Sequence, residues 1–239
     1  MLKDIWEKTP FHLAHRGASG IAPENTLVAF RKALEIGSLM VECDIHATRE
    51  GTVVVMHDAA VNRTTNGTGA IKEMSLAEIK RLDAGSWFAP EFAGEPVPTL
   101  SELLQVLRGR TTLSLEIKQA GIEEASVAAL RDNGMFDDTL VISFLPQALV
   151  RVKEIAPALP TGLLVSKGTI QEVVAKAQEV GAEVLSAHRA MVNAELVGAA
   201  HSAELKVTAW IANDRPEQQR LIELGVEAIG TDHPEQWQW

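Results

Sequence analysis

Four short stretches bring together side chains that transfer protons, bind metals or hold phosphate: His15-Arg16-Gly17, Glu42-Cys43-Asp44, His57-Asp58 and Glu116-Ile117-Lys118. Imidazole groups exchange protons near neutral pH. An arginine can hold a phosphate through two parallel hydrogen bonds, and glycine lets the backbone approach a ligand closely. Two carboxylates spaced two residues apart on a strand point to the same face. The four stretches therefore indicate acid–base and metal chemistry, provided that the fold brings them to one place.

Nine mostly apolar runs alternate with helical patterns, and each has the near-continuous hydrophobicity of a strand buried on both faces. These runs are Phe11–His15, Met40–Ile45, Thr52–His57, Thr112–Ile117, Leu140–Phe144, Thr161–Val165, Glu183–Ala187, Lys206–Ile211 and Val226–Thr231. Among the helices, we expect one that Asn25 caps, that runs to about Ile36 and that ends at Gly37. Strands that alternate with helices predict a parallel sheet.

One of the nine strands is too close to its neighbour for a parallel connection, which needs about a dozen residues or more. Residues 48–51 read as a turn, so residues 40–47 and 52–57 should form a hairpin. If the turn centres on Glu50-Gly51, Asp44 lies opposite His57. The eight remaining strands predict an α/β fold, a (β/α)8 TIM barrel, in which active sites lie at the C-terminal ends of the strands.

We expect residues 1–239 to form a single TIM-barrel domain that carries a small insertion over residues 59–97. This segment departs from the barrel pattern, because it has turn signals and one short helix after Ser75. It also contains three aromatic residues, Trp87, Phe88 and Phe92. We expect the insertion to cover the barrel mouth and its aromatic side chains to form a small core of their own.

Three acids, Glu42, Asp44 and Glu116, fall near strand ends at the predicted mouth. Unpaired carboxylates would be costly to bury there, so they need counterions. Their hard oxygen ligands suit Mg²⁺, Ca²⁺ or Mn²⁺ rather than zinc, and we favour one such divalent ion. The alternative is a network of salt bridges with Arg16 and Lys118. The histidines could themselves be metal ligands, but phosphate chemistry needs a proton donor and an acceptor.

Composition limits the possible partners. The 239 residues carry a formal net charge of -10, which argues against nucleic-acid binding and means that an anionic substrate needs local cations. The single Cys43 fits a reducing compartment, and no apolar run approaches the roughly 20 residues of a membrane span. We therefore expect a cytoplasmic protein without stable membrane association. It is a possible homo-oligomer, in which Trp237 and Trp239 form a packed cap or a contact surface.

At this point the motifs resemble those of the glycerophosphodiester phosphodiesterase family, relatives of the phosphatidylinositol-specific phospholipases C. The matching stretches beyond the first four run from residue 23 to residue 232: Pro23-Glu24-Asn25-Thr26, Arg63-Thr64-Thr65-Asn66-Gly67-Thr68-Gly69, Asp83-Ala84-Gly85-Ser86-Trp87-Phe88, Pro98-Thr99-Leu100, Ser143-Phe144, Trp210 with Asn213, and Gly230-Thr231-Asp232. The resemblance implies a TIM barrel, a divalent metal and hydrolysis of glycerophosphodiesters, such as glycerophosphocholine or glycerophosphoethanolamine, to glycerol 3-phosphate and an alcohol.

The resemblance also implies a role for each matched residue. Glu42, Asp44 and Glu116 become metal ligands, His15 and His57 the acid–base pair, and Arg16 and Lys118 phosphate contacts. Phe144 and Trp210, at strand ends, are candidates for the wall that faces glycerol or the alcohol. His46 lies on the same strand face as Asp44, where it either joins the mouth or faces solvent. Asp58 is a candidate to orient His57.

Two points of the mechanism stay open at the level of sequence. Either histidine could be the base, and the nucleophile could be water or the neighbouring glycerol hydroxyl, of which we favour the hydroxyl and hence a cyclic phosphate. Two other functions are compatible with the barrel: a phospholipase D-like enzyme acting on lysolipids or sphingomyelin, and a non-catalytic phosphodiester-binding module. The module should lack some of the site residues, whereas every expected one is present.

Overall fold

Nine strands form one continuous sheet in the computed structural model, which describes residues 2–237. The strands are β1 (Phe11–Ala14), β2 (Met40–Ala47), β3 (Val53–Val55), β4 (Thr112–Ile117), β5 (Thr139–Ser143), β6 (Thr161–Val165), β7 (Val184–His188), β8 (Lys206–Trp210) and β9 (Ala228–Thr231). Their order is β1-β9-β8-β7-β6-β5-β4-β2-β3, and β1 also pairs with β2. Eight parallel strands thus close into the predicted TIM barrel, and β3 lies outside the ring.

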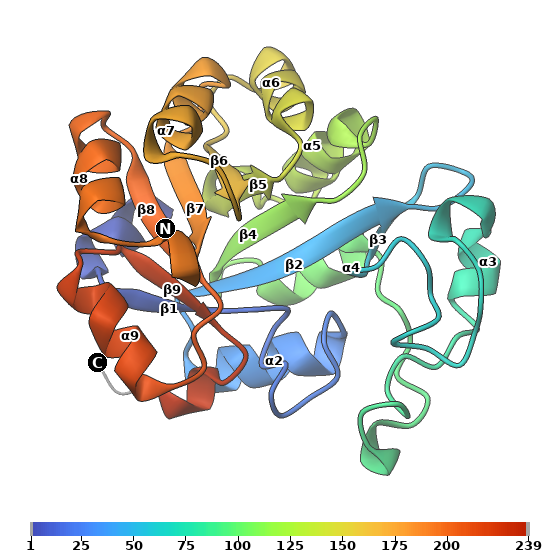
Figure 1. Cartoon of the computed structure of the whole chain (residues 1–239). Helices are drawn as coiled ribbons and strands as arrows, with labels where there is room; N and C mark the ends of the chain where they lie inside the picture. The colour runs from blue at the N-terminus through green and yellow to red at the C-terminus, as the bar shows by residue number, and fades with distance from the viewer. Residues whose placement is uncertain (1, 238–239) are drawn as a thin grey trace.

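Most helices lie around this barrel, whereas the short helix of residues 76–79 lies away from it, as Figure 1 shows. They are α1 (Leu2–Ile5), α2 (Leu27–Ile36), α3 (Leu76–Ile79), α4 (Leu100–Leu107), α5 (Glu123–Asp132), α6 (Pro146–Ile155), α7 (Ile170–Glu179), α8 (Ala194–Ser202) and α9 (Arg215–Glu223). Six short 3₁₀ helices accompany them: η1 (Trp6–Lys8), η2 (Ile71–Glu73), η3 (Pro90–Phe92), η4 (Phe136–Asp138), η5 (Arg189–Met191) and η6 (Pro234–Gln236). Within residues 2–237, no helix is both long and apolar enough to cross a membrane.

The hairpin of β2 and β3 is present, but its predicted register is wrong by one residue. Ile45 pairs with Val55, and the backbone N–H of Met56 donates to the Asp44 carbonyl, so Met56 rather than His57 lies opposite Asp44. The cause is a turn of three residues, which Gly51 closes with a φ of 83° that favours glycine. His57 comes after β3 has ended, so strand alternation does not fix the direction of its side chain.

The start of α2 also differs from the prediction. Thr26, not Asn25, is the N-cap, because the Thr26 hydroxyl accepts from the backbone N–H of Ala29. Asn25 has a φ of 57°, in the left-handed region, and points its side chain elsewhere. The end of the helix is as predicted, since Gly37 adopts a φ of 86° and returns its N–H to the last turn.

The two ends of the barrel interior differ in chemistry. At the amino ends of the strands, α1 buries Leu2 and Ile5 against apolar side chains inside the barrel, among them Leu13, Leu140 and Leu164. This apolar packing fills one end, so the open end lies at the carboxyl ends of the strands. Near the C-terminus, the Trp237 ring lies 5.5 Å from the ring of His12, whereas Trp239 lies outside the described residues.

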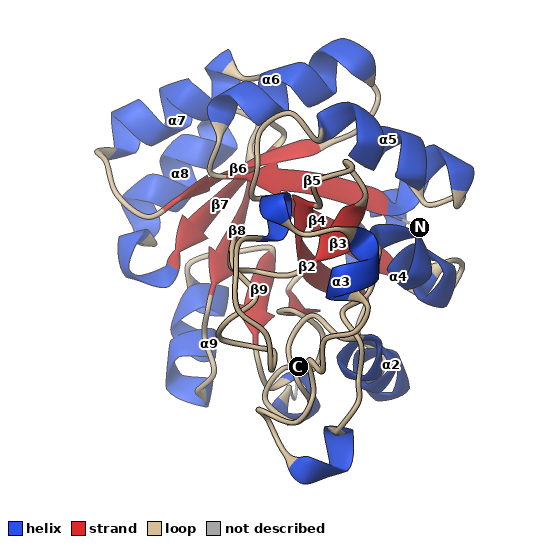
Figure 2. Cartoon of the chain, turned by 90° about the vertical axis from the view of Figure 1, so that its right-hand side faces the viewer, coloured by secondary structure: helices blue, strands red, loops and turns tan. Residues whose placement is uncertain are grey.

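Residues 59–97 form an excursion between β3 and α4, beyond the carboxyl ends of β2 and β4 (Figures 1 and 2). Its small core is aliphatic, built on side chains such as Val61, Ile71 and Ile79. The expectation that its aromatic residues form this core is therefore wrong. Trp87, Phe88 and Phe92 stack edge to face in a row instead, with Trp87 40% exposed.

Candidate active site

Three carboxylates meet at the carboxyl ends of β2 and β4. Asp44 pairs in register with Glu116 on the neighbouring strand, and Glu42 lies two residues before Asp44 on the same face. One oxygen from each of the three lies within 4.8 Å of the others, and all three residues are buried. Cys43, between the two acids of β2, points the other way into the core around the barrel, as strand alternation requires.

Two oxygens of this cluster lack a hydrogen-bond donor. Glu42 Oε1 and Asp44 Oδ1 are buried and accept no hydrogen bond from the described residues. Such atoms are costly in a folded protein unless a cation or water satisfies them. The all-oxygen donor set matches the preference of Mg²⁺, Ca²⁺ and Mn²⁺. The residues present therefore fit a divalent metal.

The cluster resists full ionisation in the absence of an ion. Burial, together with the charges of Asp44 and Glu116, raises the pKa of Glu42 well above its usual range. Burial and Asp44 also raise the pKa of Glu116 to about 7. Burial acts in the same direction on Asp44, but Arg16 and Lys118 outweigh it and lower the pKa of Asp44. Without a cation, Asp44 is thus favoured in its ionised form, whereas Glu42 and Glu116 are favoured in their protonated forms. A bound cation would favour the ionised form of all three.

The backbone conformation of Arg16 directs this residue toward the three acids. The residue has a φ of 56°, a left-handed conformation that is uncommon for a non-glycine residue. In this conformation its backbone N–H donates to Glu42 Oε2 at 3.0 Å, and its Nε lies 3.2 Å from Asp44 Oδ2. Its Nη1 donates to Glu24 Oε1 at 2.8 Å. Arg16, whose side chain is largely buried, is thus held against the acids by both its main chain and its side chain.

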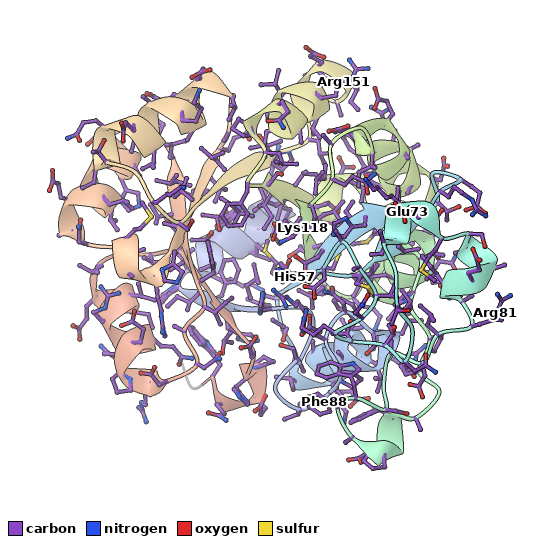
Figure 3. All side chains as sticks on the ribbon, turned by 45° about the vertical axis from the view of Figure 1, so that its right-hand side comes forward. His57, Glu73, Arg81, Phe88, Lys118 and Arg151 are labelled. Atoms are coloured by element: carbon purple, nitrogen blue, oxygen red, sulfur yellow. The ribbon has the colours of Figure 1, made fainter. Side chains whose placement is uncertain are left out.

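Lys118 is the second cation of the site. Its Nζ lies 2.8 Å from Glu116 Oε1 and 3.4 Å from Asp44 Oδ1. The salt bridges foreseen as the alternative to a metal are therefore present, but Asp44 Oδ1 has only the 3.4 Å ion-pair contact without a hydrogen bond, and Glu42 Oε1 accepts no hydrogen bond from the described residues. Figure 3 places Lys118 near His57 at the centre of the barrel mouth.

Each of the two predicted histidines has a carboxylate partner. His15 Nδ1 lies 2.7 Å from Asp232 Oδ1, and His57 Nδ1 lies 2.6 Å from Asp58 Oδ1. The contact expected between Asp58 and His57 is confirmed. A carboxylate on Nδ1 fixes the tautomer and leaves Nε2 for proton transfer. Burial lowers the pKa of His57, although Asp44 and Asp58 act in the opposite direction.

Other residues surround these groups, and the roles of Asn25 and Asp232 were not predicted. Asn25 donates through Nδ2 to Asp44 Oδ2 at 2.9 Å, so the residue expected to cap a helix instead holds a metal-ligand candidate. Asp232 follows β9, the neighbour of β1 in the ring, and that adjacency could have indicated its contact with His15. His46 is buried, and its Nε2 lies 3.1 Å from the His57 carbonyl, so it does not face solvent.

A cavity of about 150 Å³ opens among these side chains. It is lined by His15, Arg16, Glu42, Glu116, Lys118 and His57 on its polar side and by apolar residues that include Phe144 and Trp210 on the other. The two aromatic rings meet edge to face at 5.5 Å, and Lys118 Nζ lies 5.9 Å from the Phe144 ring centre. All nine site residues predicted from the sequence thus lie at the mouth of the barrel, with Asp44 beside the cavity.

Acids, cations and paired histidines meet at one end of this TIM barrel, and relatives of the chain identify it as a phosphoric diester hydrolase. The chain belongs to the glycerophosphoryl diester phosphodiesterase family, whose model matches residues 15–236.

Several relatives support the assignment over nearly their full length. The chain is 37% identical to a glycerophosphodiester phosphodiesterase of Caldanaerobacter subterraneus and 35% identical to a putative one, YhdW, of Bacillus subtilis. Each match covers 93% of this chain and 94% of the relative. A phosphodiesterase of Oleispira antarctica, solved in complex with the product sn-glycerol-3-phosphate, superposes with a TM-score of 0.89 at 35% identity. That match covers 97% of this chain and 96% of the other.

Proposed function

We propose that this protein hydrolyses small glycerophosphodiesters to glycerol 3-phosphate and an alcohol, with one divalent metal ion held by Glu42, Asp44 and Glu116. The observation that carries the proposal is the shared cavity, which two carboxylate-paired histidines line together with Glu42, Glu116 and both cations. The Oleispira enzyme, with the same fold and 35% identity, binds glycerol 3-phosphate as its product. The bound ion would supply Lewis-acid neutralisation of the phosphate charge.

The protein's own cations would bind the phosphate. Arg16 and Lys118 face the cavity from the carboxyl ends of β1 and β4, and both carry positive charge across the neutral range. Contact with the non-bridging oxygens offsets the negative charge that makes a phosphodiester a poor electrophile. Phe144 and Trp210 form the apolar wall against which the carbon atoms of glycerol or the alcohol would pack.

The two histidines would move the protons. One Nε2 removes the proton of the attacking hydroxyl, and the other donates a proton to the oxygen of the departing alcohol as its bond to phosphorus breaks. We favour attack by the neighbouring glycerol hydroxyl, which gives a cyclic glycerol phosphate. A water molecule, activated by the second histidine in its new protonation state, then opens the ring to glycerol 3-phosphate.

A coupled assay tests the function directly. Purified enzyme, supplied with Mg²⁺ or Ca²⁺, should release glycerol 3-phosphate from glycerophosphocholine, followed with a coupled dehydrogenase. ³¹P NMR of the same reaction should show a transient cyclic phosphate. Faster turnover of lysophosphatidylcholine would indicate the lipid-directed alternative, and binding without turnover would indicate a non-catalytic module.

A further inference from the structure

We propose that Arg63, in the excursion of residues 59–97, is a positioning residue that clamps Asp58 against Glu24 and so fixes the His57 imidazole for proton transfer. The inference rests on the proposed function, because it takes His57 to be one of the two proton-transfer groups. Arg63 itself is neither one of the metal-ligand candidates nor one of the residues that line the cavity.

Arg63 binds two carboxylates at once, and each is gripped through two hydrogen bonds. Its Nε donates to Asp58 Oδ2 at 2.8 Å and its Nη2 to Asp58 Oδ1 at 3.1 Å. Its Nη1 and Nη2 donate to Glu24 Oε2 and Oε1, each at 2.8 Å. The planar guanidinium therefore sets the orientation of both carboxylates, which a flexible ammonium group could not do.

The clamp joins the histidine to a fixed anchor. Asp58 Oδ1, held by Arg63, is the same oxygen that lies 2.6 Å from His57 Nδ1. On the other side, Glu24 is anchored by Arg16, whose Nη1 donates to Glu24 Oε1. A continuous line of contacts thus runs from His57 through Asp58, Arg63 and Glu24 to Arg16.

The exposure of Arg63 bears on whether its contacts contribute to the orientation of Asp58 and His57 or to the stability of the fold. Its side chain is 44% exposed, so solvent screening reduces the free energy that its ion pairs contribute to folding. What the four hydrogen bonds fix directly is the orientation of the two carboxylates. The other histidine is held differently, because its partner Asp232 accepts from the neutral groups of Ser19 and Asn213.

Arg63 also sets the charge beside His57. Its hydrogen bonds hold the pKa of Asp58 far below the usual range, so Asp58 stays ionised and accepts from His57 Nδ1. The other charged groups that face His57 are Asp44, Arg16 and Lys118. Removal of the Arg63 cation leaves the Asp58 charge less compensated, which stabilises the imidazolium. The pKa of His57 should therefore rise in the variant.

Two substitutions separate charge from geometry. Arg63→Met should lower kcat by about 10- to 100-fold, the size expected when a catalytic group is slightly misplaced. It should also move one limb of the pH profile to higher pH. The acid limb moves if His57 is the base, and the alkaline limb moves if it is the acid. Arg63→Lys should restore the position of that limb while kcat stays low.

The matched control is Arg81→Met. Arg81 is exposed in the same excursion, at its outer edge and away from His57 (Figure 3). This variant should keep the wild-type kcat and pH profile. A second test combines Arg63→Met with Asp58→Asn. If Arg63 acts through Asp58, the Arg63 substitution should add little to the loss caused by Asp58→Asn alone. Fully additive losses would overturn the proposal.

A spectroscopic readout keeps this test independent of turnover. In metal-loaded protein without substrate, ¹⁵N side-chain NMR of His57 should show the Nδ1–H tautomer in the wild type. In Arg63→Met it should show tautomer mixing and a raised titration midpoint, with a melting temperature near that of the wild type. An unchanged His57 spectrum would refute the role of Arg63 even if the phosphodiesterase assay succeeds. If the wild type has no phosphodiesterase activity but Arg63→Met still shows the shifted His57 spectrum, only the proposed function is refuted. If Arg63→Met does not fold, Arg63→Lys tests the geometry alone: its His57 should show tautomer mixing while the titration midpoint stays at the wild-type value, and an unmixed tautomer would refute the proposal.

Discussion

The residue after the first strand of the barrel meets the residue after the last: His15 Nδ1 lies 2.7 Å from Asp232 Oδ1. Closure of the ring between β1 and β9 is what brings these two positions together, although they lie 217 residues apart in the chain. Ser19 and Asn213 donate to the same carboxylate. His15 is therefore oriented by the geometry of the closed barrel itself.

Asp232→Asn tests this relationship. An amide can donate to His15 Nδ1 and so favour the wrong tautomer, with the proton on Nε2, while the shape of the site is kept. We expect kcat to fall by about 100-fold or more, with a smaller change in KM, because proton transfer is what is lost. Steady-state kinetics with glycerophosphocholine measures both constants. A kcat within a factor of two of the wild type would remove Asp232 from the mechanism.

Removal of the histidines themselves is the more direct test of acid–base catalysis. His15→Ala and His57→Ala should each lower kcat by at least about 100-fold while circular dichroism and melting temperature show a folded barrel. His201→Ala, on the exposed end of α8, is the control and should leave kcat unchanged. If either site variant retains more than about a tenth of the wild-type kcat, that histidine is neither the acid nor the base.

The metal assignment predicts reversible inactivation. Exhaustive chelation should abolish activity, and Mg²⁺, Mn²⁺ or Ca²⁺ should restore it, whereas zinc should restore it poorly because the three ligands are all carboxylates. Isothermal titration of the chelated protein should show one ion bound. Glu116→Gln should weaken this binding. Full activity after complete removal of divalent ions would contradict the assignment.

Metal binding should depend on pH, with a sign that follows from the acids. The pKa of Glu116 is raised to about 7 and that of Glu42 is also raised, so below neutral pH the ion must displace protons. Affinity should therefore fall as pH drops from 8 to 6. Raised carboxyl pKa values also mean that the metal-free protein loses stability as pH rises from the unfolded value of about 4.5 through 7. The metal-induced rise in melting temperature should accordingly be larger at pH 8 than at pH 5.5, and a pH-independent rise would contradict this reading.

The sequence was sufficient to predict the barrel and the convergence of the nine residues at its mouth for one physical reason. In a parallel barrel every strand ends at the same mouth, so polar residues after apolar runs must converge there. Alternation along β2 was enough to place Glu42 and Asp44 on one face and Cys43 on the other. This argument needs only the alternation of side chains along a strand and the common direction of parallel strands.

Backbone geometry at single residues was beyond the same reasoning. Asn25 has the residue type of a helix cap, but its backbone is left-handed and its side chain donates to Asp44. Thr26 is the N-cap residue instead. A turn of three residues rather than two moved Met56 opposite Asp44. The burial of His46 and the aliphatic core of residues 59–97 depend on tertiary packing, which residue type alone does not specify.

Lys118 combines phosphate recognition with charge balance, and one substitution tests both. Lys118 Nζ lies close to Glu116 and Asp44, and it lines the cavity. Lys118→Met keeps the length of the side chain and removes its charge. Because a preplaced cation in such a site contributes a few kcal/mol to transition-state stabilisation, kcat/KM should fall by about 100-fold or more.

The same substitution leaves the three acids less compensated when no metal is bound. The native state then depends more on the ion, through mass action of a ligand that binds only folded protein. Metal should therefore raise the melting temperature of Lys118→Met by more than it raises that of the wild type. Lys72→Met, an exposed position in η2, is the control and should match the wild type in both measurements. An unchanged kcat/KM would remove Lys118 from the site. A large loss of activity with an unchanged metal-dependent shift would keep Lys118 as a phosphate contact and refute its part in balancing Glu42, Asp44 and Glu116.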